Sequence, residues 1–326
     1  MIHEEDWRPT ASHDLLRARA DLLAKIRDFF RSAGILEVDT PACSAAAATD
    51  PAIESLATAY TGPGAPAGKP LYLHTSPEFA MKRLLASGVG PIYQICKVFR
   101  DGEAGRLHNP EFTLLEWYRP GYDHHRLMDE VEALIYAVLP EPCPVRRVSY
   151  GRLFEDLLAI NPHLAGPEEL RRVAVNQGIQ GISALGLPDR DAWLDLLMSH
   201  CIEPKLGSGM CFVYNYPASQ ASLARIRQGD PPVAERFELY LNGVELANGF
   251  HELGDHEEQR LRFKADLERR REEGQMIPPV DDRFLNALEA GLPDSSGVAL
   301  GIDRLLMCIA GAAHISEVLA FPLDRA

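Results

Sequence analysis

Apolar residues recur at helical spacing near the start of the chain. Seven Leu, Ile and Phe residues lie between Leu15 and Phe30, and Gly34 stands where a helix commonly ends. This pattern predicts a helix over residues 15–33. Residues 35–39 then alternate like a strand, which Pro41 ends.

The same patterns divide the rest of the chain into elements. Apolar and alternating runs predict strands at 71–74, 92–99, 111–118, 211–216 and 297–301. Helical spacing predicts helices at 79–85, 255–273 and 303–310, with Ser76 as the N-cap of the first and Pro77 as its first residue. We expect one domain over residues 1–326, with a helical insertion at about 150–205.

A hairpin is predicted between Phe237 and Phe250. Asn242-Gly243 is the dipeptide favoured in two-residue type I′ turns, so Tyr240 should face Glu245. Glu238 and Glu245 then share one face as diagonal neighbours. They either face water at an edge or bind a cation. Asn248 and Glu252 follow closely and favour a cation, and oxygen ligands suit Mg²⁺. Strict alternation places Glu252 on the opposite face, so we expect a bulge near Gly249.

Composition narrows the class of protein. The 326-residue chain is 46% hydrophobic and carries a formal net charge of −14, which argues against a general nucleic-acid-binding surface. Six scattered cysteines indicate neither a disulfide framework nor a zinc site. No stretch has the length of a membrane span, and residues 1–9 do not resemble a signal peptide, so we expect no membrane partner and a cytoplasmic location.

Three blocks together resemble the signature motifs of class II aminoacyl-tRNA synthetases. The first block is the predicted helix and strand that end at Pro41, a region that forms the dimer interface in that family. The second runs from Phe99 to Tyr118 and contains His-Asn-Pro-Glu-Phe-Thr, and the third is residues 297–305. The resemblance implies an α+β fold, with an antiparallel sheet flanked by helices, and a homodimer.

Within the superfamily, the sequence is most similar to lysyl-tRNA synthetase catalytic domains, and closer still to the family of truncated relatives, the elongation factor P beta-lysine ligases. The first motif begins near Leu15, so we expect no N-terminal OB-fold anticodon domain. The resemblance therefore implies elongation factor P as the acceptor, with tRNA charging unlikely. β-Lysine or lysine is the expected amino acid, and ATP and Mg²⁺ are the expected cofactors.

The resemblance also implies site residues. Arg100 and Arg304 correspond to the catalytic arginines that contact the phosphates. ATP binding is expected at Arg100, Asp101, Gly102, Glu103, His108, Asn109, Phe112, Glu245, Leu246, Gly301 and Arg304. Substrate binding is expected at Ser76, Pro77, Glu78, Glu116, Tyr118, Asn248, Glu252 and Ala299, and metal binding at Glu238 and Glu245.

Two positions differ from the usual synthetase pattern. Gly102 stands where the second motif usually has Glu, so either Glu103 takes that role or backbone groups replace it. Ala299 stands where lysyl-tRNA synthetases have Gly, and its methyl group would favour β-lysine over α-lysine by about 1–3 kcal/mol. The alternatives are a catalytically silent paralogue with a regulatory role, and a lysine-activating ligase with another acceptor.

Overall fold

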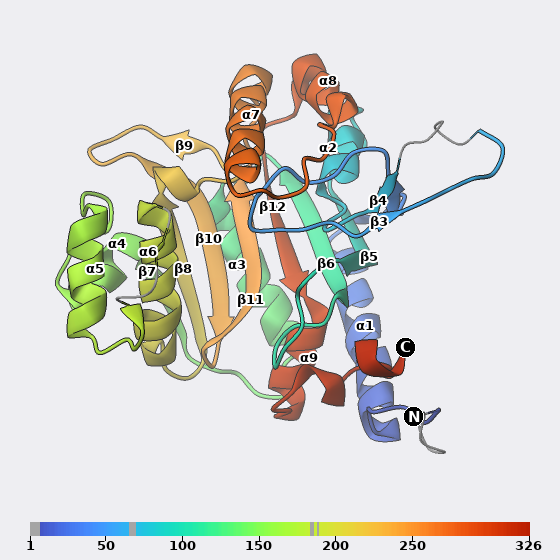
Figure 1. Cartoon of the computed structure of the whole chain (residues 1–326). Helices are drawn as coiled ribbons and strands as arrows, with labels where there is room; N and C mark the ends of the chain where they lie inside the picture. Colours follow the sequence, from blue (N-terminus) through green and yellow to red (C-terminus); the bar gives the residue numbers. More distant parts are fainter. Residues whose placement is uncertain (1–6, 65–69, 183–185, 188) are drawn as a thin grey trace. The chain divides into compact units, whose positions relative to one another are not determined.

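The computed structural model describes residues 7–64, 70–182, 186–187 and 189–326 (Figure 1). These residues form two compact units. Unit 1 comprises residues 1–140 and 252–326, and unit 2 comprises residues 141–251.

The main sheet of unit 1 contains a strand from each of the three recognised motifs. Its strands lie in the order β1 (Leu36–Glu37), β5 (Ile92–Phe99), β6 (Glu111–Pro120) and β12 (Ser295–Gly301). β6 pairs antiparallel with both β5 and β12, whereas β1 pairs parallel with β5. The register between β6 and β12 places Ala299 opposite Glu116 and Gly297 opposite Tyr118. A second, small sheet contains β2 (Cys43–Ser44), β4 (Leu71–Leu73) and β3 (Ala57–Thr58), in that order.

Helices accompany both sheets of unit 1. They are α1 (His13–Ser32), α2 (Glu78–Ala86), α3 (His124–Val138), α7 (His256–Glu272), α8 (Asp282–Gly291) and α9 (Ile302–Ala310), with the short turns η5 (Ile315–Glu317) and η6 (Leu323–Arg325). The predicted first helix buries Phe30, whose ring stacks on Tyr93 at 4.4 Å and meets Trp117 edge-on at 5.3 Å. α1 is thereby fixed to the sheet by aromatic packing.

The element predictions in unit 1 are largely confirmed. β5 has the predicted bounds, and Gly34 takes a φ of 69°, as expected after a helix. The predicted cap of α2 is wrong by one residue, because Pro77 occupies the N-cap position and the helix begins at Glu78. The hydroxyl of Ser76 accepts from the Glu78 N–H at 3.0 Å and donates to a strand carboxylate, which holds it outside the usual cap geometry.

Unit 2 is built on a second set of strands. β11 (Val244–His251), β10 (Val233–Leu241) and β8 (Met210–Pro217) pair antiparallel, β7 (Val145–Ser149) pairs parallel with β8, and β9 (Ile226–Arg227) pairs with β10. The helices α4 (Tyr150–Leu158), α5 (Pro167–Asn176) and α6 (Arg190–Leu197) gather beside β7 and β8 (Figure 1). The short turns η2 (Met198–Ile202), η3 (Glu203–Lys205) and η4 (Ala218–Gln220) complete the unit.

The helices of unit 2 lie where residues 150–205 were expected to be helical. They enclose a core that includes Phe154, Leu170 and Leu194, each fully buried. That these helices are an insertion in a single catalytic domain stays a prediction.

The β10–β11 hairpin has the predicted turn. Asn242 and Gly243 take φ values of 52° and 77°, as a type I′ turn requires, and Tyr240 lies opposite Glu245. The expected bulge near Gly249 is misplaced. Leu239 pairs with Ala247, so Leu246 is the extra residue and the bulge lies next to the turn. Because one residue is inserted, Asn248 opposite Glu238 lies on the same face as Glu245.

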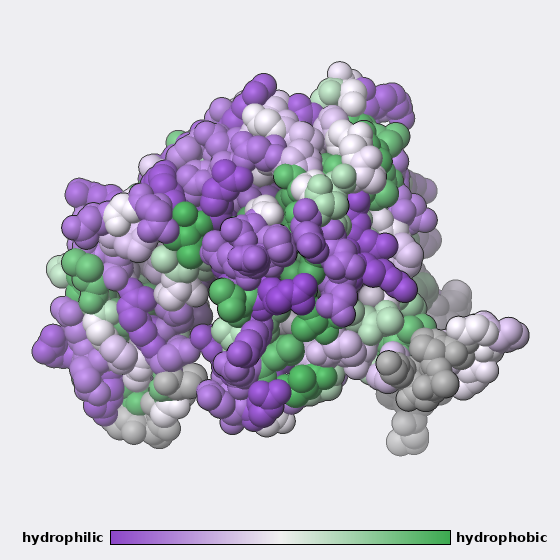
Figure 2. All heavy atoms as spheres, turned by 90° about the horizontal axis from the view of Figure 1, so that it is seen from above, coloured by the Kyte–Doolittle hydropathy of each residue, from purple (hydrophilic) through white to green (hydrophobic). Residues whose placement is uncertain are grey.

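Polar residues dominate the face on which α7 lies. In Figure 2, which views the molecule from the side of α7, the surface is mostly hydrophilic, and α7 itself is rich in Glu and Arg. Among the residues that the structure describes, none forms a strand before α1, and no helix is long and apolar enough to cross a membrane.

Candidate functional site

Three carboxylates come together inside unit 1. Glu116 on β6 and Glu252 are 2% and 1% exposed, and Glu78 begins α2. Ser76 donates to one oxygen of Glu116 at 2.7 Å, and the Tyr118 hydroxyl donates to the other at 2.6 Å. Three of the predicted substrate residues, Ser76, Glu116 and Tyr118, are thus joined by hydrogen bonds.

Lys82 completes this group, which we call the carboxylate pocket: Glu78, Lys82, Glu116, Tyr118 and Glu252. The Lys82 ammonium lies 2.6 Å from Glu78 Oε1 and 2.5 Å from Glu252 Oε2, and its side chain is 1% exposed. The sequence prediction omitted this residue. One signal was available, because Lys82 follows Glu78 by four positions on a predicted helix, where the two side chains meet.

Burial shifts the pKa values in the carboxylate pocket. It raises the pKa of Glu116 to about 7, with the charge of Glu78 adding to the shift. It also raises the pKa of Glu252 to about 8, even though Lys82 opposes the shift. Burial and then the charge of Glu116 hold the pKa of Tyr118 well above its usual value, so the phenol stays neutral. A cation that binds beside Glu116 and Glu252 would therefore stabilise their ionised forms in place of the bound protons.

One oxygen of the pocket has no partner. Oε1 of Glu252 forms no hydrogen bond with the residues that the structure describes. Gly297 lies beside it, and a Cβ at this glycine would fall 2.5 Å from that oxygen and 2.3 Å from the Tyr118 ring. Only glycine therefore lets β12 lie this close to the unpaired, buried acceptor, and an ammonium donor from a ligand would supply the partner that Oε1 lacks.

A second cluster in unit 1 contains the predicted catalytic Arg100. Its guanidinium lies 5.0 Å from the centre of the Phe112 ring and donates to Glu103 at 3.4 Å and to the Thr75 carbonyl at 3.4 Å. Gly102 has a φ of 75°, a conformation that favours glycine, and the turn brings Glu103 to Arg100. This placement agrees with the first of the two alternatives for the missing motif Glu.

The other predicted arginine, Arg304 on α9, lies against His108. Its Nη2 is 2.6 Å from His108 Nε2, and its Nε donates to the Leu107 carbonyl at 3.2 Å. Burial lowers the pKa of His108, and the positive charge of Arg304 lowers it further, so a neutral imidazole accepts this bond. Arg304 is thus held on the loop that follows Arg100.

Two further predicted ATP residues are engaged within the chain. Asn109 donates to the Glu111 carbonyl at 2.7 Å and accepts from the Leu323 N–H at 3.1 Å. Asp101 accepts from the Gly102 N–H at 2.8 Å. Both side chains shape the loop of the second motif in this structure.

The third motif is anchored by a residue that sequence reasoning missed. Asp303, 1% exposed, pairs with Arg19 of α1 at 2.6 Å and accepts from the Thr113 N–H of β6 at 2.6 Å. Arg19 also donates to the Thr113 hydroxyl at 2.7 Å. This network joins a strand and two helices, and Gly301, the N-cap of α9, precedes it.

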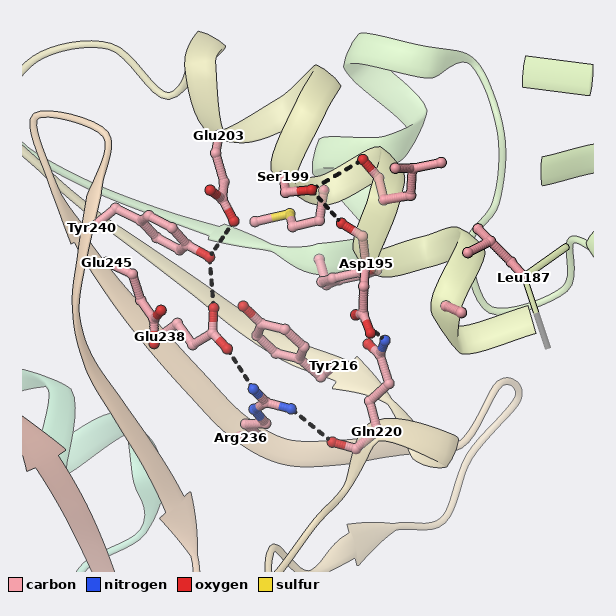
Figure 3. A pocket seen from close by; sticks show the side chains of 14 residues that line it. Leu187, Asp195, Ser199, Glu203, Tyr216, Gln220, Arg236, Glu238, Tyr240 and Glu245 are labelled. Carbon is pink, nitrogen blue, oxygen red and sulfur yellow. Dashed lines mark hydrogen bonds and ion pairs between the residues drawn. The ribbon is translucent and has the colours of Figure 1, made fainter. Parts of the chain in front are cut away.

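In unit 2, Glu238 and Glu245 line one cavity of about 400 Å³ (Figure 3). Glu238 forms an ion pair with Arg236 and accepts from the Tyr240 hydroxyl at 2.6 Å. Asp195 also faces the cavity, and burial raises its pKa to about 6. The predicted metal residues therefore do share a cavity, but the partly buried Arg236 already pairs with Glu238.

The remaining predicted residues of unit 2 flank this cavity. Asn248 accepts from Arg236 Nε at 3.1 Å, and Leu246, the bulged residue, is 3% exposed. Arg236 and Tyr240 were not predicted as site residues. Their alternation with Glu238 on β10 would have indicated that the three side chains share a face.

Comparisons with known proteins agree with these motifs. A family model described as tRNA synthetases class II (D, K and N) matches residues 5–325. A Vibrio cholerae protein named elongation factor P--(R)-beta-lysine ligase is 52% identical over 98% of this chain and 99% of its own length. Proteins of the same name from Edwardsiella ictaluri and Klebsiella pneumoniae are 51% and 50% identical over the full length of both chains.

The match covers both compact units and all three recognised motifs. The predicted fold class, an α+β synthetase fold with an antiparallel sheet flanked by helices, is confirmed, although β1 pairs parallel with β5 and β7 pairs parallel with β8. The chain belongs to the class II tRNA synthetase family of the D, K and N type.

Proposed function

We propose that this chain is an ATP-dependent ligase that joins (R)-β-lysine, or lysine, to a lysine side chain of elongation factor P. The carboxylate pocket is the observation that carries this proposal. A neutral side chain in the pocket would leave buried acids unpaired, whereas a diamino acid supplies two ammonium groups. The names of the relatives, which share about half of the sequence, support the same substrate pair.

In the first step, the amino acid carboxylate would attack the α-phosphate of ATP and release pyrophosphate. Arg100 offers a planar donor for the carboxylate and the α-phosphate, and Arg304 offers one for the terminal phosphate. The cation–π contact keeps Phe112 next to Arg100, where its ring would stack on the adenine. The roles of these residues, like those of Glu103 and His108, are proposals that rest on the motif match.

Mg²⁺ fits the donor set of the unit 2 cavity. Glu238 and Glu245 supply carboxylate oxygens to one cavity, and such ligands suit Mg²⁺ when phosphates complete the shell. Mg²⁺ held there would neutralise phosphate charge. Arg236 would have to release Glu238 before Mg²⁺ could bind there, because these two side chains form an ion pair in the structure.

In the second step, a lysine ε-amine of elongation factor P would attack the carbonyl carbon of the adenylate. The new amide bond forms, AMP leaves, and the amine proton passes to solvent. None of the residues discussed above is assigned as a general base. Ala299 lies opposite Glu116, so its methyl group shares a face with the carboxylate pocket, which supports a preference for β-lysine.

Two further proposals concern the setting of the enzyme. A homodimer through residues 35–41 is supported by β1, an edge strand on which Leu36 is 53% exposed. A cytoplasmic location remains the expectation from the sequence.

Pyrophosphate exchange tests the activation step. The protein is incubated with ATP, Mg²⁺, labelled pyrophosphate and either β-lysine, α-lysine or ornithine. We expect exchange with β-lysine, weaker exchange with α-lysine, and none after removal of Mg²⁺ with EDTA. Equal exchange with both lysines would remove the role given to Ala299, and exchange with none would favour a silent paralogue.

The acceptor is tested by mass spectrometry of elongation factor P after the full reaction. We expect a mass increase of one lysine residue on one side chain. An unmodified acceptor, despite active pyrophosphate exchange, would show that the ligase has another acceptor.

A further inference from the structure

We propose that Lys82 is a permanent internal ammonium group that neutralises one of the three pocket carboxylates, so that the pocket selects ligands with two ammonium groups. This inference rests on the proposed function and assigns a specificity role to a residue outside the synthetase motifs. Lys82 acts as a positioning residue, because it works through Glu78 and Glu252.

Lys82 contacts two of the acids that we propose bind the ligand. Its ammonium bridges a residue of α2 and a residue far along the chain, at 2.6 Å and 2.5 Å. Burial alone would lower its pKa, but the charges of Glu252 and Glu78 outweigh this and raise it above the usual value. The Phe284 ring, 5.8 Å away, adds a cation–π contact. Lys82 is therefore charged throughout the neutral range.

The charges around Lys82 can then be counted. Glu78, Glu116 and Glu252 supply three negative charges, Tyr118 stays neutral, and Lys82 supplies one positive charge. Two negative charges remain when all three acids are ionised. The neighbouring thiol of Cys96 adds none, because burial and the charge of Glu116 raise its pKa to about 12. Two ammonium groups complete the pocket, whereas one would leave a buried carboxylate unpaired or protonated.

Without Lys82 the balance changes by one charge. A Lys82→Met variant has three carboxylates for two ligand ammonium groups, so one acid must keep its proton when the diamino acid binds. A second substitution, Glu78→Gln, restores the count, because Glu116 and Glu252 then meet two ammonium groups. A purely structural role of Lys82 predicts neither the extra proton nor the restoration.

Calorimetric titration with β-lysine in buffers of different ionisation enthalpy measures the protons exchanged on binding. We expect K82M to release about one proton fewer than the wild type at neutral pH, and its Kd to rise roughly tenfold, the equivalent of one pKa unit. K82M/E78Q should exchange protons like the wild type. Lys97→Met is the matched control, because Lys97 is 49% exposed, pairs with Glu111 at 3.3 Å and lies outside the pocket.

The outcomes separate the claims. The role of Lys82 would be overturned if K82M and the wild type exchanged the same number of protons. It would also be overturned if K82M raised the Kd for β-lysine equally with and without E78Q. If K82M does not fold, K82M/E78Q still decides the matter, because its neutral pair removes the buried excess charge. It should still bind β-lysine at least tenfold more tightly than a monoamino analogue, and loss of that preference would overturn the proposal. Failure to modify elongation factor P, with the proton count as expected, would overturn only the proposed acceptor.

Discussion

Gly297→Ala tests the geometry of the carboxylate pocket with a single methyl group. The added Cβ would lie 2.3 Å from Cε1 of Tyr118, 2.4 Å from its Cδ1, and 2.5 Å from Oε1 of Glu252. Such distances are well inside van der Waals contact, and both neighbours are buried. Gly297 lies within β12, paired to β6, so the backbone cannot move away without breaking the register.

The expected cost follows from overpacking. Inserting a methyl group into a packed interior costs about 1–3 kcal/mol, so the free energy of unfolding in urea should fall by that amount. If ligand binding lost a similar free energy, the KM for β-lysine would rise roughly 5- to 150-fold. The KM for ATP should change little, because the substitution lies among the acids that we propose bind the amino acid and not beside Arg100.

Gly254→Ala is the matched control for this substitution. A Cβ at Gly254 would meet only the Leu292 carbonyl, at 3.9 Å, which is ordinary contact. We expect wild-type stability and KM for this variant. An unchanged KM for β-lysine in G297A would refute the placement of Tyr118 and Glu252 around the ligand.

Three other perturbations have expected outcomes. The pKa values of Glu116 and Glu252 are raised from 4.5 to about 7 and 8, so the folded state holds these protons more tightly than the unfolded state. The free energy of unfolding should therefore fall as pH rises through that window. Urea titrations at pH 5.5 and 8.5 measure this fall, which Glu252→Gln should reduce. For the same reason the KM for β-lysine should rise as pH falls below about 8. Arg270→Met removes donors to four carbonyls and Glu54, and should lower stability by about 3 kcal/mol in the same titration. Gly243→Val, at a φ of 77°, should lower it by about 1–2 kcal/mol, whereas a stability like the wild type's would contradict the type I′ turn.

The sequence predicted the parts of the fold that local chemistry determines. Asn242-Gly243 specifies its turn because both residues take positive φ values, and the turn then determines which residues of the two strands face each other. The position of the bulge was not predictable in the same way. Leu246 is the extra residue, yet the alternation of side chains in the sequence is equally consistent with an insertion near Gly249.

The candidate site was predicted less completely, because burial depends on contacts between distant segments. Glu78, Glu116 and Glu252 were found through their resemblance to motif residues, whereas Lys82 belongs to no motif. On the predicted helix it reads as an ordinary surface partner of Glu78. Glu252 and Phe284, both from the other end of the chain, lie against Lys82, whose side chain is 1% exposed.

The contact of Lys82 with Glu78 and Glu252 also explains how a stable protein can hold three acids in the carboxylate pocket. Three carboxylates in one buried place would repel one another, and the pKa values of Glu116 and Glu252 show how strongly burial favours their neutral forms. Lys82 offsets one charge permanently, and protons offset the others until a ligand brings its own cations. At neutral pH, a ligand with two ammonium groups would have to displace these protons, and its ion pairs with the two carboxylates would have to offset that cost. A pocket of this kind discriminates by charge count before it discriminates by shape, because the second ammonium group decides whether both acids ionise.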